Sequence, residues 1–196
     1  MRSGYTGCDA VERVRCFVAV DVEDPALVSR IVNIQEQLKA SRARLKLVEP
    51  QNLHLTLRFI GEVAKPLVSE IAGVLEEIEF ASFKLELAGV GAFPNRRRPR
   101  VVWIGVREGH DELAELSRRV NEALAKLKIP KPREDFVPHL TIARVKGAAG
   151  DLPRVLAELE GVEVGEMLVS NFRLKKSTLT PRGPVYETLF EKRARE

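Results

Sequence analysis

One four-residue pattern occurs twice in the chain and limits its fold more than any other feature. His54 begins the tetrapeptide HLTL, and His139 begins HLTI 85 positions later. The same shift aligns the strand-like run RCFVAV at 15–20 with RVVWIGV at 100–106. It also places the segment around Leu85 near Ser170, in a second apolar run. Two copies of one motif in matching halves indicate a duplicated unit.

Apolar spacing around these repeats predicts alternating strands and helices. Strands are expected at 15–20, 45–48, 53–60, 83–92, 101–106, 139–145, 166–175 and 184–191. Helices are expected at 25–40, 67–78, 111–127 and 153–160, where apolar residues recur every three or four positions. No glycine-rich phosphate turn follows a strand, so this mixed order favours an α+β fold over a dinucleotide-binding fold.

The predicted architecture is therefore one domain over 1–196 with two pseudo-symmetric lobes. Each lobe is expected to be an antiparallel sheet with helices packed outside, and the two lobes form a central cleft. The lobe repeats cover approximately 15–92 and 100–175, and a C-terminal strand follows at 184–191. Matching units of this kind usually pack about an approximate two-fold axis.

The composition is that of a globular protein, with 44% hydrophobic and 31% charged residues. No run of 18 apolar residues and no apolar signal segment is present, so we expect a cytoplasmic protein without a membrane span. Cys8 and Cys16 are too few for a disulfide framework and lack the partners of a zinc ribbon. We interpret one as frayed and the other as packed in a strand.

The net charge of +4 does not by itself indicate a nucleic-acid partner. Three basic runs are more informative, and each is either solvated surface or a contact for an anionic ligand. They are Arg96, Arg97, Arg98 and Arg100; then Lys126, Lys128, Lys131 and Arg133; and finally Lys175, Lys176 and Arg182.

The repeated motif points to acid–base chemistry on a phosphodiester. Alternation along a strand puts His54 and Thr56 on one face, about 6.6 Å apart, and does the same for His139 and Thr141. Paired imidazoles suit proton transfer near neutral pH, one acting as base and the other as acid. Threonine hydroxyls can donate to phosphate oxygens, and nearby arginines would stabilise the charge on phosphorus. The alternative is that both histidines are hydrogen-bonded structural residues.

Other catalytic arrangements fit less well. Two histidines are too few for a zinc site, so no metal and no cofactor is expected. No serine elbow is present for a Ser/His/Asp relay. The third histidine, His110, lies between Gly109 and Asp111 at an expected helix start and is interpreted as surface.

The two motifs resemble the twin HxTx signature of the 2H phosphoesterases. Within that superfamily the chain is most similar to the RNA 2′,3′-cyclic phosphodiesterases, historically called 2′–5′ RNA ligases. The supporting segments are PQNLHLTLRFIGEV, VVWIGV, DFVPHLTIARV and STLTPRGPVYETLF. The resemblance covers about Arg15 to Phe190 and implies metal-independent hydrolysis of a terminal 2′,3′-cyclic phosphate to a 2′-phosphomonoester.

The resemblance also implies roles for individual residues. His54 would donate a proton to the departing 3′ oxygen, and His139 would activate water. Thr56 and Thr141 would hold phosphate oxygens, as would Arg144, which lies five residues after the second histidine. Strict alternation, however, places Arg144 opposite His139 and places Arg58 on the face of His54. A bulge or the strand end must turn Arg144 inward, or Arg58 binds the phosphate instead.

The resemblance implies an RNA partner with a 2′,3′-cyclic phosphate end, including tRNA-derived ends. Nucleotides are a further class of expected ligand. The protein is expected to be a monomer. Arg96, Arg97, Arg98 and Arg100 are the expected contacts with the RNA backbone. Phe17, Trp103 and Tyr186 could stack on a base or belong to the core. Two alternatives stay open: a 2′–5′ ligase that joins tRNA-half-like ends, and a non-catalytic RNA-binding module.

Overall fold

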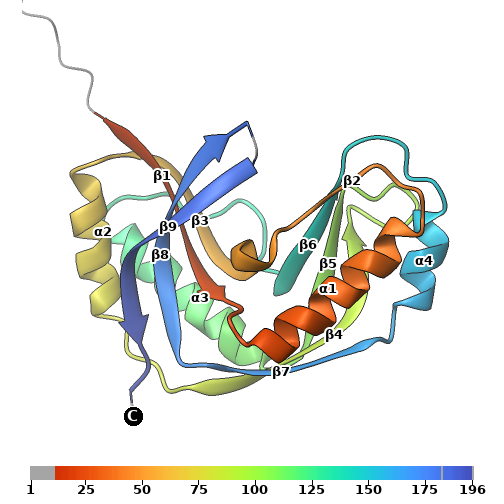
Figure 1. Cartoon of the computed structure of the whole chain (residues 1–196). Coiled ribbons are helices and arrows are strands. Elements are labelled where there is room, and N and C mark those ends of the chain that lie inside the picture. Colours follow the sequence, from red (N-terminus) through yellow and green to blue (C-terminus); the bar gives the residue numbers. More distant parts are fainter. Residues whose placement is uncertain (1–11, 182, 196) are drawn as a thin grey trace, which may run out of the picture.

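The computed structural model describes residues 12–181 and 183–195 (Figure 1). Cys8 and Arg182 lie outside the described residues. The elements follow the predicted alternation of strands and helices: β1 (Arg13–Asp21), α1 (Pro25–Lys39), β2 (Leu45–Leu47), the 3₁₀ turn η1 (Pro50–Asn52), β3 (His54–Ala64), α2 (Leu67–Glu76), β4 (Phe83–Phe93), β5 (Val101–Glu108), α3 (His110–Ala125), β6 (His139–Val145), α4 (Leu152–Glu158), β7 (Glu163–Val169), β8 (Asn171–Thr180) and β9 (Gly183–Arg193).

The strands form one antiparallel sheet that divides into two lobes. Its order is β7-β4-β5-β6-β3-β1-β8-β9, and β2 pairs with β6. We call β3, β1, β8 and β9 the first lobe, and β6, β5, β4, β7 and β2 the second lobe. The lobes diverge on either side of the centre in Figure 1. Between β3 and β6 the register contains a single pair, Leu55 with Leu140. The α+β fold with two pseudo-symmetric lobes is confirmed.

The sequence repeats and the spatial lobes do not coincide, because each repeat donates elements to the other lobe. Strand β4 of the first repeat pairs with β5, whereas β8 of the second repeat pairs with β1. The helices are exchanged in the same way: α1 packs on β6 and β7, and α3 packs on β3. Helix α2 joins α3 on the first lobe, and α4 joins α1 on the second (Figure 1). The core of each lobe is therefore built from both halves of the chain.

The helices begin and bury residues as their sequence predicts. In α1 the stripe Leu27, Ile31, Ile34 and Leu38 is buried against the sheet. The side chain of Asp24 accepts a hydrogen bond of 2.7 Å from the Leu27 amide, which caps the helix N-terminus. Cys16 is buried in β1, as the sequence predicted for one of the two cysteines.

The strand predicted at 166–175 is wrong as a single element. The structure divides this run at Ser170 into β7, which pairs with β4, and β8, which pairs with β1. The chain thus passes from the second lobe to the first while it stays extended. An apolar extended run indicates backbone conformation but not the pairing partner, so the sequence pattern did not reveal this crossing. Within the described ranges, no helix has the length and apolar character needed to cross a membrane.

Candidate active site

The two histidines lie at the starts of the adjacent strands β3 and β6. Because Leu55 pairs antiparallel with Leu140, the register places His54 across from Thr141 and Thr56 across from His139. Both leucines are fully buried, so the histidines and threonines emerge together on the opposite face of the sheet. Neither threonine hydroxyl has a hydrogen-bond partner in the part of the chain that the structure describes. The fold thus brings both motifs to one place.

Each imidazole is oriented by a backbone carbonyl two residues before it. His54 Nδ1 lies 2.7 Å from the Asn52 carbonyl oxygen, and His139 Nδ1 lies 2.7 Å from that of Val137. A carbonyl oxygen can only accept, so both Nδ1 atoms carry hydrogen. This fixes the tautomer and leaves both Nε2 atoms available for proton transfer.

Aromatic rings pack beside both histidines, and both residues are partly exposed. The His54 ring centroid lies 5.0 Å from that of Phe17 and 5.3 Å from that of Tyr186. The His139 centroid lies 5.0 Å from Phe93 and 6.4 Å from Trp103. The three aromatic residues singled out in the sequence therefore all border the site, and Phe93 joins them.

Burial lowers the pKa of both histidines below the ordinary histidine value. For His54, loss of solvation is the main cause, with smaller lowering by the positive charges of Lys175 and His139. The Asn52 hydrogen bond and the Asp21 carboxylate act in the opposite direction. For His139, loss of solvation is again the main cause, and Arg144 adds to the lowering.

A β-bulge at Ile142 brings Arg144 to the face of the sheet that carries His139. Trp103 pairs with Thr141 and Val102 with Ala143, so Ile142 is an extra residue in β6. Ile142 and Ala143 are consequently both buried, and the alternation shifts by one position. Arg144 therefore shares the face of His139, where its charge adds to the lowering of the His139 pKa by burial and opposes the rise that burial causes in the Tyr186 pKa. The bulge resolves the conflict between alternation and the family pattern.

The same bulge occurs in the first repeat, at Leu57. Ala19 pairs with Thr56 and Val18 with Arg58, which leaves Leu57 as the extra residue. A helix side chain satisfies the carbonyl of each bulged residue. Ser117 Oγ donates to Leu57 O, and Gln35 Nε2 donates to Ile142 O, both at 2.8 Å. These contacts explain why two polar side chains, Ser117 and Gln35, are buried.

The expectation that Arg58 shares the face of His54 is wrong. The Leu57 bulge places Arg58 beside the fully buried Val18, on the face that packs against the helices. Its guanidinium donates to the carbonyl of Pro130, in the segment between α3 and β6. Burial also lowers the Arg58 pKa. The position that corresponds to Arg144 in the first repeat is Phe59, a residue that is 64% exposed.

An ionic network beside His54 was not predicted from the sequence. Asp21 is the register partner of His54, and its carboxylate contacts Lys175 Nζ at 2.6 Å and Arg173 Nη1 at 2.8 Å. Arg173 also binds Glu23 and Glu191. Lys175 was noted in a basic run, but the pattern gave no sign that it would be buried.

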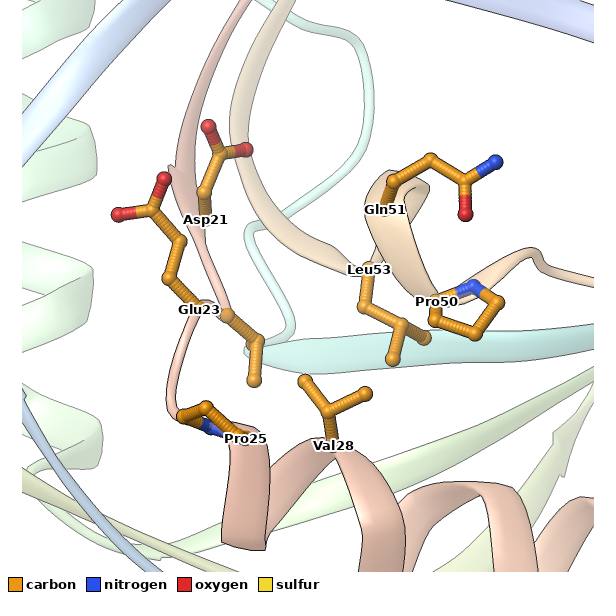
Figure 2. A pocket seen from close by; sticks show the side chains of 8 residues that line it. Asp21, Glu23, Pro25, Val28, Pro50, Gln51 and Leu53 are labelled. Atoms are coloured by element: carbon orange, nitrogen blue, oxygen red, sulfur yellow. The ribbon is translucent and has the colours of Figure 1, made fainter.

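A pocket of about 370 Å³ opens next to this network. In Figure 2, Asp21 and Glu23 lie on one side, Pro50 and Gln51 lie on the other, and Leu53 and Val28 lie between them. The pocket is thus apolar at its centre and polar at its edges. It connects the end of β1 with the turn that precedes His54.

The arginine run at 96–100 forms the turn between β4 and β5. It follows Phe93, which contacts His139, so the turn begins next to the site. The amides of Arg97 and Arg98 donate to Asn95 Oδ1 at 3.1 and 3.0 Å. Arg96 forms an ion pair with Glu160 at 2.6 Å. Arg97, Arg98 and Arg100 are all exposed on this turn.

Among the described residues, no group of three or more His, Cys, Asp or Glu side chains is arranged to hold a metal ion. The side chains that the two motifs and Arg144 bring together can transfer protons and donate hydrogen bonds to an anion. They are two imidazoles, two hydroxyls and one guanidinium.

Comparison with known proteins gives a consistent assignment. A family model described as LigT like Phosphoesterase matches the chain twice, over residues 21–103 and 104–186. A protein of Archaeoglobus fulgidus named RNA 2′,3′-cyclic phosphodiesterase is 44% identical over 176 residues, which cover 90% of this chain and 98% of the relative. Its namesake from Aeropyrum pernix is 43% identical over 170 residues, with coverages of 86% and 97%.

Solved structures show the same fold. The crystal structure of TT0787 of Thermus thermophilus has a TM-score of 0.79 and 30% identity, and the match covers 91% of this chain and 97% of that chain. The structure of E. coli LigT complexed with 3′-AMP has a TM-score of 0.78 and 26% identity, with coverages of 94% and 100%. Together with the doubled match and the twin HxT strands, these similarities establish that the chain belongs to the LigT-like family of 2H phosphoesterases.

Proposed function

We propose that this protein hydrolyses RNA 2′,3′-cyclic phosphate ends to 2′-phosphomonoesters without a metal ion. The observation that carries the proposal is the pair of HxT motifs on either side of the Leu55–Leu140 pair, with both Nε2 atoms free to exchange protons. The names of the relatives support the same reaction and substrate class.

In the proposed step, the cyclic phosphate lies between the two imidazoles. His139 Nε2 takes a proton from water, and the water oxygen forms a bond to phosphorus. The bond from phosphorus to the 3′ oxygen breaks, and protonated His54 gives its Nε2 proton to that oxygen. The products are a 2′-phosphate and a 3′-hydroxyl. After the step His139 is protonated and His54 is neutral. Proton exchange with solvent restores the starting protonation states.

The remaining site residues hold the phosphate. The hydroxyls of Thr56 and Thr141, which have no hydrogen-bond partner among the described residues, donate to its non-bridging oxygens. Arg144 stabilises the charge that develops on phosphorus, because the bulge brings it to the face of His139. The arginines of the β4–β5 turn extend the contact to the RNA backbone, and tRNA-derived ends are among the expected substrates.

A short oligonucleotide that ends in a 2′,3′-cyclic phosphate tests the reaction in excess EDTA. Turnover to a 2′-phosphate is expected, identified by its sensitivity to phosphatase and by comparison with synthetic 2′ and 3′ isomers. A second arm adds an oligonucleotide with a 5′-hydroxyl, because the same histidines could run the reverse step and form a 2′–5′ linkage. Binding without turnover would contradict the proposal and indicate an RNA-binding module.

A further inference from the structure

The two histidines occupy equivalent positions but unequal surroundings. Across the strand pair, His54 faces Asp21, whereas His139 faces Gly105. Paired residues of neighbouring antiparallel strands point to the same face, so the Asp21 carboxylate lies on the side of the His54 imidazole. In the second lobe, the β4 residues paired with Gly105 and Trp103 are Ala88 and Gly91, which carry no charge.

Asp21 is held by two cations, of which Lys175 is buried and Arg173 is partly buried. The Asp21 side chain is 11% exposed, and those of Lys175 and Arg173 are 8% and 15% exposed. Lys175 Nζ reaches both Asp21 oxygens, at 2.6 and 2.7 Å. Burial of an ion pair costs solvation free energy, so such a pair adds little to the stability of the fold. The chemistry of the neighbouring His54 therefore explains the Asp21–Lys175 pair better than stability does.

We propose that Asp21, held by Lys175, is a positioning residue that makes His54 rather than His139 the histidine that carries the proton. This inference rests on the proposed function and deepens it, because it names what separates the roles of two otherwise equivalent imidazoles. The proposal assigns no direct contact with the substrate to Asp21 or Lys175. Both act through His54.

The charges around each ring agree with this assignment. The groups that act on His54 are Asp21 on β1, Lys175 on β8 and His139 on β6, with the Tyr186 phenol on β9 beside the ring. Of these charges, only that of Asp21 favours the protonated imidazole. At His139, the charge that acts is that of Arg144, which disfavours protonation. Loss of solvation lowers the pKa of each ring and one backbone carbonyl raises it, so the feature that His54 has and His139 lacks is a neighbouring negative charge.

Proton NMR titration of the histidine C2 resonances tests the inference without any substrate. Assignments come from H54Q, H139Q and H110Q. In K175M the His54 pKa is expected to rise, because a nearby positive charge is lost; in D21N it is expected to fall. The double variant D21N/K175M is expected to lie between them. K176M is the matched control, because it removes the adjacent lysine, whose partner Glu187 is exposed. The change in the His54 pKa in K176M defines the size of a shift that counts as no effect.

The same variants give an activity readout that separates the two proposals. The alkaline limb of the kcat/KM profile should move to higher pH in K175M and to lower pH in D21N. A His54 pKa that shifts no more than in K176M, or shifts as far as that of His139, would overturn the inference even if cyclic phosphate is hydrolysed. Absence of turnover in the wild type would overturn the proposed function, and the NMR result would still decide this inference. If D21N does not fold, K175M and the double variant carry the test.

Discussion

Leu55 of β3 and Leu140 of β6 form the single register pair, within the described residues, that connects the two lobes of the sheet. Each leucine is preceded by a histidine and followed by a threonine, so the pair brings two motifs from distant parts of the sequence together. Strands β3 and β6 share no further register pair within the described residues, so the two motifs lie where the lobes separate.

Replacement of either cleft histidine is expected to remove most of the activity. His54→Ala and His139→Ala should each lower kcat by about 10²–10⁴-fold, the usual contribution of a positioned proton transfer. His110→Ala is the matched control, since this exposed histidine contacts only Asp111 among the residues that the structure describes. Initial rates on a cyclic-phosphate oligonucleotide check the prediction. Equal rates for His139→Ala and His110→Ala would contradict it.

Arg144 and Arg58 are expected to respond differently to the same change. Arg144→Met should lower kcat by about 10²-fold with little change in stability, because an exposed donor to the phosphate is lost. Arg58→Met should leave kcat within a fewfold and lower the free energy of unfolding by about 1 kcal/mol, because the bond to Pro130 is lost. Steady-state kinetics and urea unfolding of both variants separate the effects. The reverse pattern would assign the phosphate to Arg58.

The pH profile of kcat/KM should be a bell whose maximum lies on the acid side of pH 6.5. This profile reports the free enzyme, where burial lowers the pKa of both histidines below the ordinary value of about 6.5. A maximum above that value would mean that the imidazoles are more solvated than their aromatic surroundings indicate. Rates measured from about pH 4.5 to 8.5 at constant ionic strength decide between these outcomes.

The same lowered pKa values predict a loss of stability on acidification. Between the unfolded and folded pKa values, the unfolded chain binds more protons than the native protein, so the free energy of unfolding falls as pH drops below about 6.5. The contribution is fully present above that pH. His54→Gln and His139→Gln should each reduce the slope between about pH 7.5 and 5.5. Urea unfolding measures it, and His110→Gln should retain the wild-type slope.

The arginines of the β4–β5 turn should affect long substrates more than short ones. Arg97→Ala and Arg98→Ala are expected to reduce the salt dependence of RNA binding by about one unit of slope each, because each removes one phosphate contact. A cyclic mononucleotide should be hydrolysed at the wild-type rate by both variants. Binding titrations from about 50 to 300 mM salt provide the measurement. An unchanged slope would place the RNA elsewhere.

The sequence predicted the fold and the two motifs because both depend on local patterns. Strict alternation in LHLTLRFI and helical spacing in α1 report burial directly, and the structure agrees as far as the bulge in β3. The misplacement of Arg58 has a specific cause, since the bulges at Leu57 and Ile142 insert one residue that alternation cannot count. The Asp21–Lys175 pair joins residues 154 positions apart, so no local pattern could reveal it.

Because the two repeats exchange elements, neither half of the chain contains a complete lobe. A fragment that ends at residue 103 would contain β1 and β3 but neither α3, which covers β3, nor β8, the neighbour of β1. The complementary fragment would likewise leave β6 without α1. Neither piece can bury its own apolar surface, so we expect each to stay unfolded alone and the two to assemble only when mixed, as an interlocked pair.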